Sequence, residues 1–244
     1  MGAAVAPRDV PQLDASAVRV SVVIPALNER HTIARALEST RLPGVERIVI
    51  DGGSGDGTAE FARSSGAEKV IRAGPGRAHQ LDVGYRQAAG EVIVFLHADT
   101  RLGPGWLEAI GAALRDPAVA GGAFRLAFDS RRPIYRAAEL LVRLRSRLAR
   151  LPFGDQALFA RRELIDARGG IPWVPIFEDL DLVGAIRSRG RLALLSECAW
   201  TSTRRYERNG MFRQVLRNNA ALLAWFLGLD RERVAGWYLR RPGR

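Results

Sequence analysis

Four short apolar runs, each followed by a polar or glycine-containing loop and a helical segment, constrain the fold of this chain most strongly. They occupy residues 18–24, 47–50, 69–71 and 92–96. Runs that are apolar on both faces predict parallel strands that helices cover from both sides. No linker or internal repeat separates this half from the rest. The sequence therefore predicts one continuous, mostly parallel sheet in a single α/β domain.

The second half of the chain is less regular. It contains a strand-like run at residues 122–128, an arginine-rich amphipathic helix at 134–148 and a strand-like segment at 156–160. A helix at 178–189 and a longer one at 211–227 follow, and we expect the longer one to pack inward. We expect residues 1–17, which lack a continuous apolar segment, to be a disordered leader rather than a signal peptide.

The chain is strongly basic, with a formal net charge of +11 over 244 residues. A charge of this sign fits nucleic acid, an anionic membrane surface or a phosphorylated substrate. No aromatic-interleaved or recognition-helix pattern accompanies the basic clusters, so we expect no nucleic-acid partner. The single cysteine, Cys198, excludes an internal disulfide and indicates a reducing cytoplasm. No apolar run is long enough to predict a transmembrane helix.

Polar side chains follow three of the predicted strands. The first strand leads into residues 25–29, the second into 51–58 and the fourth into 97–100. Ligands of open parallel sheets lie beyond the carboxyl ends of the strands, so these loops predict one shared site. Taken singly, each has a plainer explanation: Asn28 or Glu29 can cap a helix, and Asp51 can bond its own glycine turn.

The run VVIPALNE at residues 22–29, followed by VIDGGSGDGT at 49–58, resembles the opening of family 2 glycosyltransferases. Further matches are GEVIVFLHAD at 90–99, the glycine pair at 169–170 and FEDLDL at 177–182, so the resemblance covers about residues 20–190. It implies the GT-A fold, a Rossmann-like and mostly parallel sheet with helices on both faces. It also implies transfer of a sugar from a nucleoside-diphosphate donor to an acceptor hydroxyl of a small molecule or lipid.

Three other segments resemble one bacterial subgroup more closely, namely FLHADTRL at 95–102, PFGDQ at 152–156 and TSTRRY at 201–206. That subgroup is labelled radical-SAM/selenodomain-associated, or arsenosugar-biosynthesis, transferase. The resemblance also divides the expected single domain, residues 18–244, into three parts. These are a nucleotide-sugar-binding half at 18–100, an acceptor half at 101–206 and C-terminal helices at 207–244.

The family pattern assigns donor contacts to Pro25, Asn28, Glu29 and Asp51, which would hold the base and ribose. A carboxylate such as Asp51 accepts hydrogen bonds from a base N–H or a ribose hydroxyl. Arg77 follows a glycine at a predicted helix start, where a guanidinium and backbone N–H groups meet a diphosphate. The alternative for Arg77 is a solvated surface arginine.

His97 and Asp99 stand where the family has its Asp-x-Asp motif. The resemblance implies that Asp99 binds a divalent cation bridging the two donor phosphates. One carboxylate with diphosphate oxygens and waters suits a hard ion, Mg²⁺ or Mn²⁺. His97 replaces the first aspartate, which usually faces the ribose or sugar, so this position departs from the family pattern.

Glu178 and Asp179 resemble the acidic pair of the family at the head of an acceptor-side helix, where the helix dipole alone also favours acids. We expect Asp179 to be the general base in an inverting displacement, with Asp155 as the second candidate. Asp155 is also expected to bind acceptor or sugar hydroxyls, and Gln156 is expected to contact the acceptor or a phosphate. Three residues of the C-terminal part are expected to close over the phosphates: Arg204, Arg205 and Tyr206.

Two other functional classes compete with this interpretation. A nucleotidyltransferase would normally have a glycine-rich, lysine-bearing loop after its first strand, whereas residues 25–29 read PALNE. A non-catalytic basic module would bind nucleic acid or a membrane. Five arginines on and after the predicted helix 134–148 are compatible with a peripheral contact at the inner membrane face, or with an ordinary solvated surface: Arg136, Arg143, Arg145, Arg147 and Arg150.

Overall fold

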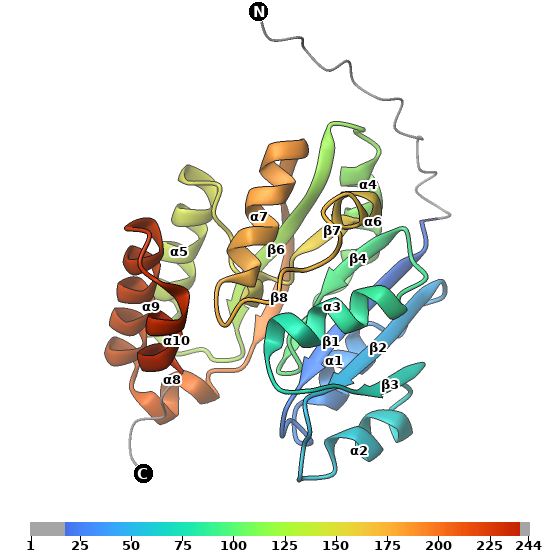
Figure 1. The fold of residues 1–244 in the computed structure, drawn as a ribbon, viewed down its shortest axis with the longest axis horizontal. Helices are drawn as coiled ribbons and strands as arrows, with labels where there is room; N and C mark the ends of the chain where they lie inside the picture. The colour runs from blue at the N-terminus through green and yellow to red at the C-terminus, as the bar shows by residue number, and fades with distance from the viewer. Residues whose placement is uncertain (1–17, 240–244) are drawn as a thin grey trace, which may run out of the picture.

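The structure is a computed structural model that describes residues 18–239, so the predicted leader and residues 240–244 lie outside the description. Within this range, one eight-stranded sheet carries helices on both faces (Figure 1). The strands are β1 (Val20–Ala26), β2 (Val45–Asp51), β3 (Lys69–Arg72), β4 (Val92–Phe95), β5 (Thr100–Leu102), β6 (Val119–Phe128), β7 (Phe159–Arg161) and β8 (Arg191–Thr201). The helices are α1 (Ile33–Ser39), α2 (Thr58–Ser64), α3 (Arg77–Gln87), α4 (Trp106–Leu114), α5 (Pro133–Leu148), α6 (Arg162–Asp166), α7 (Glu178–Arg189), α8 (Arg204–Asn209), α9 (Met211–Phe226) and α10 (Arg231–Tyr238), with a 3-10 helix η1 (Gly154–Gln156).

The strand order is β3-β2-β1-β4-β7-β6-β8-β5. The first four strands along the chain run parallel, as predicted, with Ala26 beside Asp51 and Val23 beside Phe95. Their carboxyl ends therefore share one edge of the sheet. Strand β8 is parallel to β6 and ends at Thr201, beside Phe128, so α8 begins at that edge too.

Two short strands make the sheet mixed. Strand β7 is antiparallel to β4 and β6, and β5 is antiparallel to β8. After β6 the chain leaves the carboxyl edge along α5, returns to it at η1 and then re-enters the sheet from that edge. A connection that starts and ends at one edge produces an antiparallel neighbour. This path carries residues 154–156 to the loops that follow β1, β2 and β4.

Alternate side chains of the central strands enter two different cores. Val22 and Ile24 of β1 pack on the face that α1, α2 and α4 cover, where Trp106 is almost fully buried. Val23 points to the opposite face, which α3, α6 and α7 cover, and packs in the same core as Ile186. This alternation follows from the two-residue period of a strand. Both cores hold the sheet rigid, so the loops at its carboxyl edge have fixed positions.

Helices α5, α8, α9 and α10 form a layer beyond the sheet, on the left of Figure 1. Tyr135 of α5 and Tyr206 of α8 both pack on Phe128 at the end of β6, with ring centroids 5.2 Å away in each pair. Arg231 of α10 donates to both carboxylate oxygens of Asp181, at 2.6 and 2.8 Å. These contacts attach the layer to β6 and to the start of α7.

The expectation that the helix at 211–227 packs inward holds for one side of α9 only. Ala221 and Ala224 are buried, whereas Phe212 is 82% exposed and Leu216 71% exposed. Sequence periodicity locates an apolar face without saying what covers it, and here the layer ends at α9.

None of the helices between residues 18 and 239 combines the length and the apolar composition that a bilayer crossing requires.

Candidate active site

The loops after β1 and β2 are joined by side chain–backbone hydrogen bonds. The backbone N–H of Asn28 donates to Ser54 Oγ at 2.8 Å, and Asn28 Oδ1 accepts from the Gly55 N–H at 3.0 Å. Asn28 has a positive φ of 56°, a conformation that asparagine adopts more readily than most residues. The backbone N–H of Glu29 donates to Thr58 Oγ1 at 2.9 Å. The predicted donor-binding residues 28 and 29 are thus fixed against the glycine-rich turn.

Asp51 ends β2 and is buried beneath this turn. Its Oδ2 accepts from the backbone N–H groups of Gly53 and Ser54, at 3.2 and 3.1 Å. The turn therefore uses part of the hydrogen-bonding capacity of Asp51, which is the plainer explanation that the sequence left open. Carboxylate oxygens accept several hydrogen bonds each, so this structural role leaves room for a donor contact.

A buried glutamine of α3, which the sequence did not single out, clamps the ends of β1 and β2. Gln80 Nε2 donates to the carbonyls of Ala26 and Ile50, at 3.0 Å each. A Cβ at Gly52 would lie 2.7 Å from this nitrogen, so a side chain there would displace the clamp. Close approach rather than turn geometry explains the first glycine of the motif.

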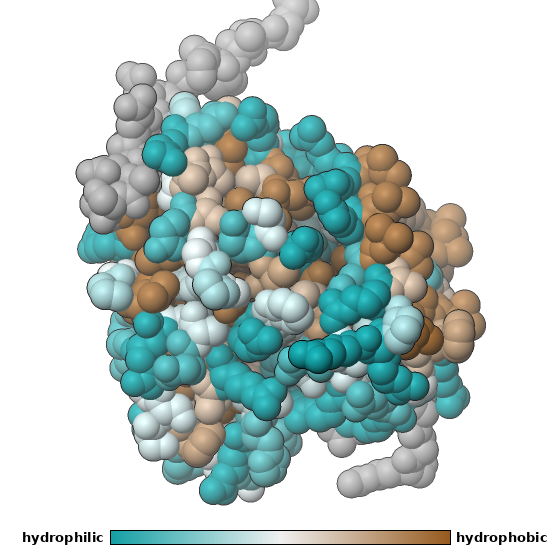
Figure 2. All heavy atoms as spheres, turned by 180° about the vertical axis from the view of Figure 1, so that it is seen from behind, coloured by the Kyte–Doolittle hydropathy of each residue, from teal (hydrophilic) through white to brown (hydrophobic). Residues whose placement is uncertain are grey.

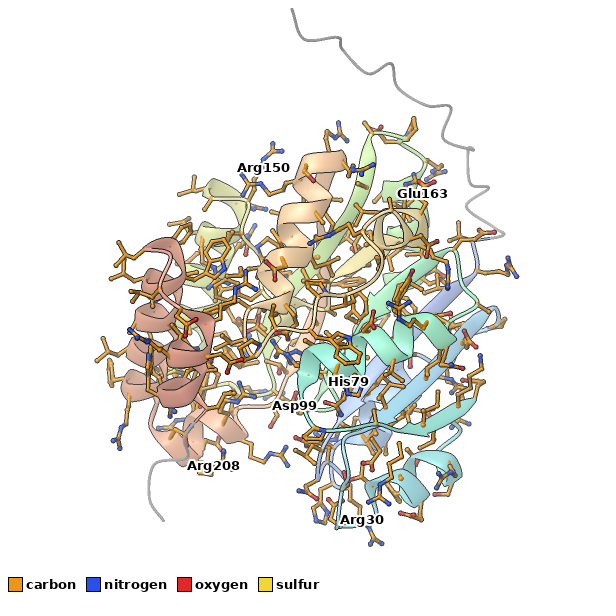
Figure 3. All side chains as sticks on the ribbon, viewed as in Figure 1. Arg30, His79, Asp99, Arg150, Glu163 and Arg208 are labelled. Atoms are coloured by element: carbon orange, nitrogen blue, oxygen red, sulfur yellow. The ribbon has the colours of Figure 1, made fainter. Side chains whose placement is uncertain are left out.

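Asp99 lies among charged side chains at the carboxyl edge, between the first strands and the C-terminal helices (Figure 3). Burial and the neighbouring charge of Glu29 raise the pKa of Asp99, while the positive charges of Arg205 and Arg204 oppose this shift. Arg204 Nη2 donates to Glu29 Oε2. Arg205 makes no hydrogen bond or ion pair within residues 18–239. The predicted metal ligand therefore has two cations of α8 beside it, one of them unpaired.

Arg77, at the first position of α3, joins the predicted donor and acceptor residues. Its guanidinium forms an ion pair with Glu178, lies 3.8 Å from Asp179 Oδ2 and is 3.3 Å from His97 Nε2. Burial alone would lower the pKa of Arg77, but the charges of Glu178 and Asp179 outweigh it and raise that pKa. The alternative hypothesis for Arg77 was a solvated surface arginine, which would not have these partners.

His97 is held as a neutral ring. Burial and the positive charges of Arg77 and Arg205 lower the pKa of His97 well below its ordinary value. Because a guanidinium only donates, the short contact with Arg77 makes His97 Nε2 the acceptor and places the ring proton on Nδ1. His97 therefore brings a polar but uncharged group where the family has a carboxylate.

A pocket with about 360 Å³ of empty space, part of it open to solvent, lies beneath these side chains. Arg77, His97, Glu178 and Asp179 form its polar wall, and Phe95 and Leu158 belong to its apolar lining. Gly154 of η1 belongs to the wall, and its N–H donates to Asp179 Oδ2 at 2.9 Å. A Cβ at Gly154 would lie 3.2 Å from His97 Nε2 and 3.3 Å from Asp179 Oδ2, so this backbone approaches both groups closely.

Asp155 has an unsatisfied buried oxygen. Within residues 18–239, its Oδ1 is one of a few buried side-chain atoms without a hydrogen-bond partner. Burial raises the pKa of Asp155, and the charge of Asp179 raises it further, while Arg145 opposes the shift. An orphaned buried polar atom is rare in native proteins and points to a missing partner such as a ligand. Asp155 does not line the 360 Å³ pocket, whereas Asp179 does.

Three further residues lie close to this cluster, and of these the sequence predicted only Tyr206 in the site. Tyr206 is electrostatically coupled to Asp155, and burial raises its pKa. Tyr238 of α10 and Arg145 of α5 belong to the same group of interacting charges, although the sequence did not place either of them in the site. Nothing in the local sequence marks them, because they reach the site only through packing of the C-terminal layer.

Two predicted site residues have clear structural partners. Gln156 is 2% exposed; its side chain accepts from Ser146 Oγ at 2.9 Å and donates to the Phe124 carbonyl at 3.0 Å. It therefore supports η1, and its predicted contact with an acceptor stays a prediction. Glu178 is 3% exposed, is paired with Arg77 and belongs to the lining of the pocket, so it positions that guanidinium there.

The residues near Asp99 suit a cation that shares its ligands with a substrate. Within residues 18–239, no three His, Cys, Asp or Glu side chains converge as a metal site. The Thr100 hydroxyl donates to Asp99 Oδ1 at a long distance of 3.4 Å. A carboxylate with little hydrogen bonding and a raised pKa gains from a nearby cation. Asp99 thus fits Mg²⁺ or Mn²⁺ when donor oxygens and waters complete the shell.

Known proteins share both the sequence pattern and the fold. The model of the family described as "Glycosyl transferase family 2" matches residues 21–168. An uncharacterized glycosyltransferase of Mycobacterium tuberculosis is 30% identical over 171 residues, which is 63% of this chain and 75% of that protein. The glycosyltransferase AglJ of Haloferax volcanii is 35% identical over 104 residues, 42% of this chain, and the match spans only 33% of AglJ.

Solved structures show the same architecture. Glucosyl-3-phosphoglycerate synthase from Mycobacterium tuberculosis, in complex with Mn²⁺, UDP and glucosyl-3-phosphoglycerate, superposes with a TM-score of 0.61 at 23% identity. The match covers 92% of this chain and 88% of that one. S. aureus TarS has a TM-score of 0.62 at 16% identity, covering 84% and 64%. The fold is the GT-A fold, and the chain belongs to glycosyl transferase family 2.

Proposed function

We propose that this enzyme transfers a sugar from a nucleoside diphosphate to an acceptor hydroxyl, with inversion at the anomeric carbon and with a divalent cation bound. One observation carries the proposal: at a single sheet edge, Asp99 and the unpaired Arg205 adjoin a pocket whose wall contains Asp179. Asp99, with a bound cation, and Arg205 suit a diphosphate, and Asp179 suits an attacking hydroxyl. The solved relatives support the donor class, since one contains UDP with Mn²⁺ and another GDP-Man with Mn²⁺.

The donor nucleoside would lie over the joined loops after β1 and β2. Asp51, Glu29 and Pro25 border this region, and Asn28 keeps the two loops together. The diphosphate would then extend toward Asp99, Arg204 and Arg205. The negative diphosphate would be attracted by Arg204 and Arg205. Both arginines lie close enough to Asp99 to lower its proton affinity. When bound, Mg²⁺ or Mn²⁺ would neutralise charge on the leaving diphosphate.

The reaction would be a single displacement in the 360 Å³ pocket. Asp179 takes the proton of the acceptor hydroxyl as that oxygen forms a bond to the anomeric carbon. The bond between this carbon and the diphosphate oxygen breaks, and the nucleoside diphosphate leaves. The Gly154 N–H and the Leu180 N–H each donate to Asp179 at 2.9 Å and hold its carboxylate in one orientation. Arg77, fixed by Glu178, orients the same group.

Family membership decides against the nucleotidyltransferase and the non-catalytic module. The finer subgroup, radical-SAM/selenodomain-associated transferases, has no support from the relatives above, whose names do not include it, and stays a prediction. The cytoplasmic location, which rests on the single cysteine, also stays a prediction, as does the division into donor and acceptor halves.

Release of nucleoside diphosphate tests the proposal. Purified protein is incubated with UDP-, GDP- and dTDP-sugars, with Mg²⁺, Mn²⁺ or excess chelator, with and without an extract of the native host as acceptor source. We expect release of one nucleoside diphosphate, faster with extract and dependent on the metal, and a sugar-bearing product in mass spectra. Absence of release from every donor in the presence of metal and extract would contradict it.

A further inference from the structure

Helix α5 carries its apolar stripe on the outside. Leu140, Leu141, Leu144 and Leu148 are between 50% and 79% exposed, and their spacing places them on one side of the helix. The opposite side faces the protein, where Tyr135 and Ser146 are buried. A single exposed leucine is ordinary, but a stripe of four along one helix is not.

Helix α9 repeats this arrangement. Phe212, Leu216, Leu223 and Phe226 recur at helical spacing and are between 59% and 82% exposed. Leu227 and Leu229 extend the stripe past the end of the helix, at 68% and 55% exposure. Figure 2 shows apolar side chains gathered along the margin of the molecule on the side where α5 and α9 lie. We call these side chains of α5 and α9 the apolar face.

Arginines without ion-pair partners border the apolar face. Arg143, Arg147 and Arg150 of the α5 segment are exposed and make no hydrogen bond or ion pair among the residues that the structure describes, and the same holds for Arg213 of α9. Arg150 follows the end of α5 at the upper margin in Figure 3. By helical angle, Arg143 and Arg147 lie directly beside the leucine stripe.

Acidic side chains do not balance this charge. Helix α9 contains no acid, and the one acid of α5, Glu139, accepts hydrogen bonds from the Phe128 N–H and from Arg136. A two-fold interface would place this face on its own copy, so positive charge would meet positive charge. A surface that carries negative charge on the outside and is apolar beneath complements the apolar face and its arginines better. An anionic lipid bilayer has this combination.

We infer that the apolar face of α5 and α9 docks the protein on anionic membrane surfaces, with leucine and phenylalanine side chains inserted at the headgroup boundary and the arginines bound to lipid phosphates. This goes beyond the proposed function and does not depend on it. The docking helix α9 follows α8 directly through Gly210, so the docked face and the arginines at the active site belong to one layer. A membrane-borne acceptor would approach the enzyme from that side.

Vesicle flotation tests this inference on the full-length protein. We expect flotation with phosphatidylcholine vesicles containing phosphatidylglycerol, little with phosphatidylcholine alone, and release at high salt. Arg143→Glu/Arg147→Glu should lower the partition coefficient by about tenfold or more. Leu144→Ser/Leu148→Ser should also lower it, because the inserted apolar area is lost. The matched control Arg63→Glu/Arg115→Glu makes the same charge change on α2 and after α4, far from this face, and should keep most binding.

Three results would overturn the inference. The first is absence of flotation with anionic vesicles, and the second is an equal loss in the control pair. The third is a stable dimer in sedimentation velocity that becomes monomeric in Leu144→Ser/Leu148→Ser, which would assign the face to a second copy. Circular dichroism confirms that each variant is folded. Hydrolysis of a soluble donor should be unchanged in Arg143→Glu/Arg147→Glu, so failure here and failure of the proposed function give different results.

Discussion

Arg77 and Glu178, which are 101 residues apart in the chain, form an ion pair between the start of α3 and the start of α7. Through this pair, α3 and α7 share one polar cluster that also contains His97 and Asp179. In the proposed reaction, this cluster lies between the diphosphate, held near Asp99, and the pocket lined by Asp179. Both sides of the proposed reaction depend on this arrangement.

The first prediction concerns this ion pair. Arg77→Met leaves Glu178 buried without a partner, so the free energy of unfolding in urea should fall by about 2 kcal/mol, a value reduced because Arg77 is partly exposed to solvent. Arg77→Met/Glu178→Gln should regain much of this loss. Wild-type stability of Arg77→Met would show that the pair contributes nothing to the fold.

The second prediction concerns the donor nucleoside. Asp51→Ala removes a carboxylate that holds the turn and that contacts the donor in the proposed reaction, so Kd for the preferred nucleoside diphosphate should rise by roughly 10- to 100-fold. Calorimetric titration measures it, and circular dichroism checks the fold. An unchanged Kd for every nucleoside diphosphate would restrict Asp51 to the turn.

The third prediction concerns the cation. Asp99→Asn should lower metal-dependent transfer by roughly 100-fold or more, because stabilisation of the leaving diphosphate is lost. The variant should also bind Mn²⁺ more weakly in the presence of nucleoside diphosphate, as electron paramagnetic resonance detects. Full turnover of the wild type in excess chelator would instead indicate that His97, in place of an aspartate, marks a metal-independent site.

The fourth prediction concerns Asp155 and pH. Burial raises the pKa of Asp155 above its ordinary value of 3.8, so the folded state favours the protonated form. The stability from this proton is complete at low pH and is lost as pH rises through the raised pKa. Asp155→Asn carries no titrating proton. Urea unfolding between pH 4 and 8 should therefore show a smaller loss of stability with rising pH in Asp155→Asn, and identical profiles would contradict the shift.

Sequence patterns located the strand ends well because the features involved are local. A β-branched run, a following proline or glycine and a polar side chain lie within a few residues of one another, and the parallel register then brings Asp51 beside Ala26. The sequence also predicted that Glu178 and Asp179 begin a helix, and α7 begins at Glu178. Their partner, Arg77, was expected at the diphosphate instead.

Features that depend on long-range packing escaped the sequence. Tyr238 and Arg145 reach the site from α10 and α5, and no local pattern links them to it. Gln156 looked available beside Asp155, yet a 3-10 turn directs its side chain into the core. The outward stripe of α9 has the periodicity of a buried helix, so its period alone could not show which side the protein covers.

The most direct test of the proposed reaction is the transfer rate of Asp179→Asn. The amide keeps the shape of the side chain but cannot take the proton of an acceptor hydroxyl. We expect donor affinity to stay near the wild-type value while transfer falls by roughly 10²–10⁴-fold. Asp155→Asn, measured in parallel, should lose less. Near-normal transfer by Asp179→Asn together with a large loss in Asp155→Asn would contradict the account and assign the base to residue 155.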